Sequence, residues 1–99
     1  MKLWVDDVRP APDGYIWERT VTNAKLKIEV AEIQEIEIEL IDIDHDAGDF
    51  AYAGGDYIKL LDWLEATGRN YPIRIHSMNP VGVANMQAII QKNGWKEVF

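Results

Sequence analysis

The sequence contains no cysteine, and this absence removes several kinds of chemistry at once. Without cysteine the chain cannot form a disulfide bond, a zinc site with thiolate ligands or a covalent intermediate on a thiol. Any bound metal ion must therefore be held by oxygen atoms or by imidazole. The chain has 2 histidines, His45 and His76, so imidazole chemistry is confined to these positions.

Basic residues are also scarce, and the apolar runs are short. There are 10 Lys and Arg residues against 17 Asp and Glu residues, which gives a formal net charge of −7. Binding to DNA or RNA polymers needs clustered cations that displace counterions, so we expect no such partner. No apolar run approaches the roughly 18 residues of a membrane span. The first residues lead straight into acidic ones rather than into a signal peptide, and we expect a cytoplasmic protein.

The chain has enough apolar residues for one compact core. Of its 99 residues, 47% are hydrophobic and 10% are aromatic. This length fits one domain of about 100 residues, and there is no linker, internal repeat or low-complexity tract that would divide it. We expect residues 1–99 to form one domain.

The order of apolar segments predicts an α/β fold. We expect strands over residues 2–5, 15–19, 36–43, 73–76 and 95–99, and helices over residues 23–32, 56–67 and 81–93. Strands that alternate with helices favour a mostly parallel sheet with helices on its faces. The last helix has the clearest start, because Asn79 suits the N-cap and Pro80 the first helical position.

The first helix has a competing interpretation. Thr22 could cap it, and Leu26, Val30 and Ile33 would share one face. Leu26, Ile28 and Val30 also alternate as they would in a strand. We favour the helix because two parallel strands in one sheet need a crossover connection, which is usually helical.

Acidic residues and both histidines follow three of the predicted strands. These groups are Asp6 and Asp7, then Asp44, His45 and Asp46, and finally the segment from His76 to Asn79. Each group alone has an ordinary structural explanation, as a solvated turn, a hydrogen-bonded core histidine or a helix cap. The carboxyl ends of parallel strands meet at one edge of the sheet, where ligands bind in such folds. Their convergence therefore predicts a functional site.

Three blocks of the sequence resemble a known family. They cover residues 1–10, 44–48 and 75–82, and read MKLWVDDVRP, DHDAG and IHSMNPVG. They are similar to the cyclic-phosphate processing receiver domains of bacteria and phages. This resemblance implies a receiver-like, flavodoxin-like sheet of five parallel strands in the order 2-1-3-4-5, without the usual last helix. It also implies the processing of cyclic phosphates derived from nucleotides or ADP-ribose.

The resemblance also implies roles for individual residues. In ordinary receivers the positions of Asp6, Asp7 and Asp44 hold magnesium, and the position of Asp44 accepts the phosphoryl group. The residues that distinguish the cyclic-phosphate family are His45, Asp46, His76, Ser77 and Asn79. No lysine lies where a receiver keeps its phosphate-sensing lysine, unless Lys96 substitutes for it, so signalling by phosphorylation of Asp44 would lack its usual readout.

Opening a cyclic phosphate needs a base to activate water or a hydroxyl and an acid to protonate the leaving oxygen. Imidazole can do both near neutral pH. We expect His45 and His76 on opposite sides of the phosphate, with Asp44 or Asp46 orienting one ring. Negative charge on the phosphate would be met by Arg9, Ser77, Asn79 and the start of the last helix, or by Mg²⁺.

Three functions remain open from the sequence. The first is a cyclic phosphodiesterase or other phosphoesterase, which we place ahead because two titratable histidines exceed what a passive phosphate site needs. The second is a protein that binds a cyclic nucleotide without cleaving it. The third is a degenerate receiver that is phosphorylated at Asp44 or serves only in dimerisation. The sequence leaves the oligomeric state open.

Overall fold

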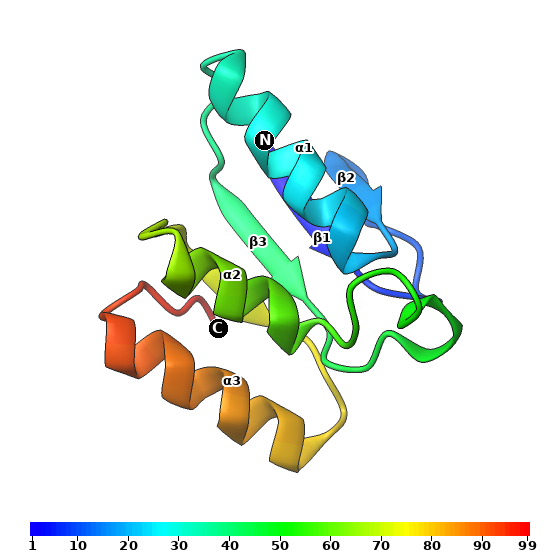
Figure 1. The fold of residues 1–99 in the computed structure, drawn as a ribbon. Helices are drawn as coiled ribbons and strands as arrows, with labels where there is room; N and C mark the ends of the chain where they lie inside the picture. Colours follow the sequence, from blue (N-terminus) through cyan, green and yellow to red (C-terminus); the bar gives the residue numbers. More distant parts are fainter.

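The computed structural model describes residues 1–99 and contains a central parallel sheet. Its strands are β1 (Lys2–Val5), β2 (Tyr15–Glu18), β3 (Leu40–Ile43) and β4 (Ile73–Ile75). Neighbouring strands are parallel, and their order is β2-β1-β3-β4 (Figure 1). The α/β class and the order of the first four strands are therefore as predicted from the sequence.

The predicted fifth strand is not formed. The C-terminal segment runs beside β4 but meets it in a single isolated bridge between Ile73 and Glu97. Ile73 donates its N–H to the Lys96 carbonyl at 2.9 Å, and its own carbonyl accepts from the Val98 N–H at 2.8 Å. One bridged residue is too little for a strand, so the sheet has 4 strands and not five.

The chain has three helices: α1 (Val21–Ile33) connects β2 to β3, α2 (Ile58–Ala66) lies between β3 and β4, and α3 (Pro80–Asn93) follows β4. A short 3-10 helix, η1 (Gly48–Phe50), follows β3. The cap of α1 is Thr20 rather than the predicted Thr22, because Thr20 has an extended backbone and its hydroxyl accepts from the Asn23 N–H at 3.0 Å. No helix has both the length and the apolar composition needed to cross a membrane.

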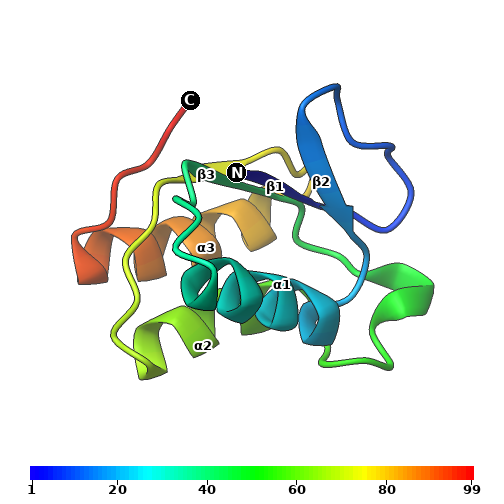
Figure 2. The same ribbon diagram turned by 90° about the horizontal axis from the view of Figure 1, so that it is seen from above.

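All three helices lie on the same face of the sheet, as Figure 2 shows. Within this layer α1 contacts α2 and α2 contacts α3. The expectation of helices on both faces was therefore wrong. The other face has no helix because the connection between β1 and β2, residues 6–14, is a loop. This loop passes over the other face, where the Trp4 Nε1–H donates to the Arg9 carbonyl at 2.9 Å.

The core lies between the sheet and the helix layer. Strand residues such as Leu3 and Ile43 pack there against Leu60, Leu61 and Leu64 of α2, and all of these are fully buried. In α1 the buried residues are Val21, Ala24, Ile28 and Ala31. The residues that were expected to share a face, Leu26, Val30 and Ile33, do so, but that face is exposed.

Candidate functional site

The ends of three neighbouring strands bring the predicted site residues to one edge of the sheet. The ladder continues one residue beyond the strands, because the Asp44 N–H donates to the Val5 carbonyl at 2.9 Å and the His76 N–H donates to the Ile43 carbonyl at 3.0 Å. These bonds fix Asp6, Asp44 and His76 side by side. The convergence expected from the strand order is therefore present.

A hollow of about 250 Å³ opens at this edge, and we call it the phosphate hollow. It is lined by Arg9, Asp44, Asp46, Ser77, Met78 and Asn79. The lining includes all three residues predicted to bind phosphate and two of the predicted catalytic residues. Met78, which sequence reasoning missed, is 84% exposed. An exposed methionine in a short loop has no sequence pattern that would mark it in advance.

Donors from two loops and one helix surround the phosphate hollow. The Arg9 Nη1 donates to the His76 carbonyl at 3.3 Å, which holds the guanidinium beside the loop that follows β4. The Ser77 hydroxyl accepts from the Asn79 N–H at 3.1 Å, and the Asn79 side-chain oxygen accepts from the Gly82 N–H at 3.0 Å. This cap confirms the predicted start of α3. The positive end of the helix therefore lies at the hollow.

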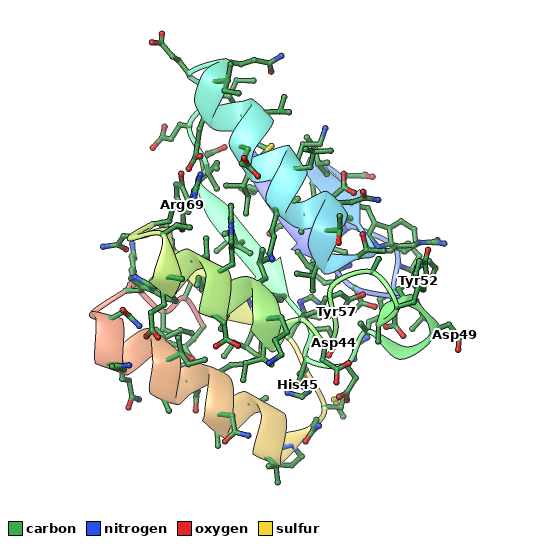
Figure 3. All side chains as sticks on the ribbon, in the orientation of Figure 1. Asp44, His45, Asp49, Tyr52, Tyr57 and Arg69 are labelled. Atoms are coloured by element: carbon green, nitrogen blue, oxygen red, sulfur yellow. The ribbon has the colours of Figure 1, made fainter.

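His45 lies at the rim of this region and is paired with its neighbour. Its Nδ1 is 2.8 Å from the Asp46 Oδ1, and its side chain is 15% exposed. The ring rests against α3, where a methyl group on the Gly82 Cα would lie 2.5 Å from the His45 Cγ. Figure 3 shows Asp44 and His45 where the chain leaves β3 and approaches the first turn of α3. A carboxylate that bonds Nδ1 fixes the ring orientation and leaves Nε2 for other partners.

His76 lies in a different environment, which we call the His76 cluster and define as His76 with Trp4, Asp6, Asp42 and Arg74. Its Nε2 is 2.8 Å from the Asp6 Oδ2 and its Nδ1 is 2.6 Å from the Asp42 Oδ1, while the side chain is only 5% exposed. The ring stacks on Trp4 with 3.9 Å between centroids. Both ring nitrogens are thus occupied by carboxylates.

The two imidazole rings therefore do not face each other across a ligand site, as the sequence led us to expect. Neither His45 nor His76 is among the residues that line the phosphate hollow. The His76 ring lies in the His76 cluster instead, because Asp42 on the adjacent strand β3 binds it there. The catalytic roles of both histidines stay predictions, but their expected geometry is corrected.

Asp42 is the main residue that sequence reasoning missed. It is 1% exposed and lies in the middle of the apolar strand β3, on the face without helices. Strand register places it beside Arg74, whose Nη1 is 3.2 Å from the Asp42 Oδ2. An acid within an apolar strand, matched by an arginine and a histidine two residues apart on the next strand, was the available signal.

The two adjacent acids of the first block differ in their environment. Asp6 is fully buried, and its Oδ1 accepts from the Val8 and Arg9 N–H groups at 2.9 and 2.8 Å. Burial raises the Asp6 pKa, but these N–H groups and His76 together bring it below its ordinary value. The Asp7 pKa is raised, first by burial and then by the nearby carboxylates of Asp6 and Asp44.

The acidic residues offer a partial fit to a divalent cation. Asp6, Asp44 and His76 each present a ligand atom, and these atoms lie within 4.8 Å of one another. The predicted magnesium ligands were Asp6, Asp7 and Asp44. The group in the structure shares Asp6 and Asp44 with this prediction but contains His76 in place of Asp7. Burial is the main cause of the raised Asp7 pKa, and the carboxylates of Asp6 and Asp44 add to it, a negative charge that a bound cation would offset. The magnesium site stays a prediction.

Comparison with known proteins agrees with these features. The sequence profile of the cyclic-phosphate processing receiver domain matches residues 1–92 of the 99-residue chain. The chain belongs to this family. The match covers all four strands and nearly all of the three helices, and it includes every residue of the phosphate hollow and of the His76 cluster. No curated protein and no solved structure matches the chain.

Proposed function

We propose that this member of the cyclic-phosphate processing receiver family binds a small cyclic phosphate in the phosphate hollow and hydrolyses it. The observation that carries the proposal is the lining of that hollow. Arg9, Ser77 and Asn79 bring donors to the same space as Asp44 and Asp46. Groups that bind an anion thus lie beside groups that can accept or orient a proton.

In this proposal His45 and Asp44 transfer the protons. The Asp44 carboxylate accepts a proton from water as the water oxygen forms a bond to phosphorus. The ring P–O bond breaks, and the leaving oxygen takes a proton from His45, whose Nδ1 is held by Asp46 at 2.8 Å. The product is a phosphate monoester with a free hydroxyl. His76 acts as a positioning residue, because its bond to Asp6 helps to hold the loop that carries Arg9.

Negative charge builds on the phosphate oxygens during this reaction and must be stabilised. The Arg9 guanidinium and the N-terminus of the 14-residue helix α3 supply positive charge at the hollow. A magnesium ion, if held by Asp6, Asp7 and Asp44, would polarise a phosphate oxygen and offset their charge. We propose Arg9 and α3 as the contribution of the chain itself.

Nucleotide-derived and ADP-ribose-derived cyclic phosphates are the proposed substrates. The test is incubation with cyclic mononucleotides, cyclic dinucleotides and cyclic ADP-ribose forms, with and without Mg²⁺, followed by mass spectrometry. We expect a product heavier than one of these substrates by one water. His45→Ala should abolish its formation, whereas Asp62→Asn, on an exposed part of α2, should not. Absence of any product across the panel, or full activity of His45→Ala, would contradict hydrolysis by this site.

A second candidate is binding without cleavage, and the environment of His76 favours it. Both His76 nitrogens are bonded to carboxylates, so only one imidazole remains near the hollow. Calorimetry with the same panel would separate the two functions. Saturable binding that requires Arg9, with the ligand recovered intact, would support binding alone.

A further inference from the structure

An aromatic patch lies where β2 ends, and we define it as Trp17, Arg19, Phe50 and Tyr52. The Arg19 Cζ lies over two of these rings, 4.1 Å from the Trp17 ring centroid and 5.6 Å from that of Phe50. The centroids of the Phe50 and Tyr52 rings are 6.4 Å apart. Tyr52 is 81% exposed, and Figure 3 shows it on the loop that contains η1. Folding therefore leaves the Tyr52 ring uncovered, so that a flat group can stack on it.

Arg19 brings hydrogen-bond donors to this patch that no carboxylate of the chain uses. It takes part in none of the ion pairs of the structure. Arg69 also stacks on a tryptophan, with its Cζ 4.2 Å from the Trp63 ring centroid, but its N–H groups bind the Glu32 carboxylate. Stacking holds the plane of the Arg19 guanidinium in the same way and leaves its N–H groups for the acceptors of a ligand.

The aromatic patch and the phosphate hollow lie at the same edge of the sheet, with carboxylates between them. Asn79, which lines the hollow, follows β4, and Asp44 follows β3. Asp7 follows β1 and Arg19 follows β2, so the strand order places these groups in a row. Neighbouring strands lie about 4.8 Å apart, so the ends of β4 and β2 are about 14 Å apart. The Asp7 carboxylate rests against the start of η1, because a methyl group on the Gly48 Cα would lie 2.6 Å from the Asp7 Oδ2. The edge thus offers donors for an anion, then carboxylates, then an aromatic surface.

A nucleotide carries groups that match this row in the same order. Its phosphate accepts hydrogen bonds, its free ribose hydroxyl can donate to a carboxylate such as that of Asp7, and its base has a flat aromatic face. Proteins hold single bases by stacking them on aromatic side chains and on the planes of arginine guanidinium groups. A cyclic phosphate without a base would leave the β2 end of the edge without a partner.

We propose that the aromatic patch is the subsite for the base of a cyclic nucleotide whose phosphate occupies the phosphate hollow. The base stacks on Tyr52, and Arg19 donates N–H groups to acceptors on the edge of the base. A purine fits best, because it has the larger stacking area and a ring nitrogen that accepts hydrogen bonds beside the stacked face. The inference rests on the proposed function for the place of the phosphate, and it narrows the substrates to cyclic phosphates that keep a base.

The test compares cyclic AMP with the matching methyl riboside cyclic phosphate, which has the same sugar and cyclic phosphate but no base. In an NMR titration of the full chain, cyclic AMP should shift the ring resonances of Tyr52 and bind about tenfold more tightly than the base-free compound. Tyr52→Ala should remove this difference and leave the affinity for the base-free compound unchanged. Tyr52→Phe, which keeps the ring, should keep the difference. Phe99→Ala is the matched control, since it removes a ring that is 92% exposed and lies outside the patch. Arg19→Lys, which lacks the planar guanidinium, should weaken the binding of cyclic AMP alone.

Adenosine, which has the base and no phosphate, separates this inference from the proposed function. It should shift the Tyr52 ring resonances in the wild type and in Arg9→Ala alike, because it needs only the patch. If adenosine does so but neither cyclic phosphate shifts the resonances of Arg9, the base subsite stands and the proposed function fails. Tyr52 resonances that move with neither adenosine nor cyclic AMP would overturn the base subsite. So would a Tyr52→Ala variant that binds cyclic AMP as tightly as Phe99→Ala, even where the base-free compound still binds at Arg9.

Discussion

The His76 cluster and the phosphate hollow lie at the same edge of the sheet but use their polar groups in opposite ways. In the cluster, Asp6 and Asp42 are buried, the His76 side chain is only 5% exposed, and its ring bonds to both carboxylates. In the phosphate hollow, Asp46 is exposed and Asn79 is partly exposed, and their one mutual contact is long, at 3.4 Å. The side chains of the cluster are bonded to one another, whereas the hollow keeps donors and acceptors that an anion could meet.

This difference separates structural from functional polar residues within one motif. No buried side-chain nitrogen or oxygen in the chain lacks a hydrogen-bond partner, so the cluster is complete without a ligand. A complete buried network stabilises one arrangement of its members and loses much when one is removed. An exposed charge beside the hollow, such as Asp46, contributes little to folding and can be changed at small cost. Stability and ligand binding should therefore respond to different substitutions.

The largest effect is expected for Asp42→Ala. This change removes a buried carboxylate that bonds the His76 Nδ1 at 2.6 Å and the Arg74 guanidinium at 3.2 Å. Loss of one partner of a buried ion pair costs about 3 kcal/mol, so the free energy of unfolding should fall by that amount. Urea unfolding followed by tryptophan fluorescence would measure it.

The matched control for Asp42→Ala is Asp46→Ala, which removes a carboxylate from the phosphate hollow. The Asp46 side chain is 58% exposed, and its ion pair with His45 should contribute less than about 1 kcal/mol. Equal losses of stability from both substitutions would show that the cluster and the hollow do not differ as the structure indicates.

The next effect concerns ligand binding and is expected for Arg9→Ala. Removal of the guanidinium should weaken the binding of inorganic phosphate by about tenfold, because a hydrogen bond to a charged group is lost. The Arg9 N–H that bonds Asp6 belongs to the backbone and is kept, so the fold should not change. Titration followed by NMR would measure both properties. Lys59→Ala, which removes an exposed cation from α2, should bind phosphate as the wild type does.

A smaller effect is expected for Gly82→Ala, which tests how His45 is held. The added methyl group would lie 2.5 Å from the His45 Cγ, so the ring must move. Steric crowding costs stability, but alanine favours the helix by about 1 kcal/mol over glycine, so the net change should be small. The ring resonances of His45 should shift and hydrolysis should fall. Asn85→Ala, on an exposed position of the same helix, should change neither.

The sequence predicted those features that depend on local pattern. The start of α3 was predicted from Asn79 and Pro80, and Asn79 does cap this helix. The convergence of the acidic blocks followed from strand order, which is a property of the whole fold class. The residues that line the phosphate hollow were predicted except for Met78, because they lie in the loops that follow strands.

The remaining features depend on contacts between distant segments, which local pattern does not record. The pairing of Asp42 with His76 joins residues 34 positions apart, and it decides that this ring is buried. The exposure of Leu26 depends on which side of α1 meets the sheet. The fifth strand failed because a segment of suitable composition met its neighbour at one residue only. In each case tertiary packing decides whether the residue is buried, exposed or paired.

The smallest expected effect is that of Glu32→Gln, which tests a polar network bonded like the His76 cluster but partly exposed. The Glu32 carboxylate accepts from the Arg69 Nη2 at 2.8 Å and from the Tyr71 hydroxyl, and its side chain is 30% exposed. The Arg69 hydrogen bond is the main cause that holds the Glu32 pKa below its ordinary 4.5, against the opposing effect of burial. The pair therefore stabilises the fold above pH 4.5, and this contribution is lost as the pH falls through the lower folded-state pKa.

Unfolding free energies should differ by about 0.5 kcal/mol between wild type and Glu32→Gln at neutral pH and converge in acid. Glu37→Gln, at an exposed position, should match the wild type at both pH values. A loss for Glu32→Gln as large as that for Asp42→Ala would mean that burial is not what distinguishes the His76 cluster.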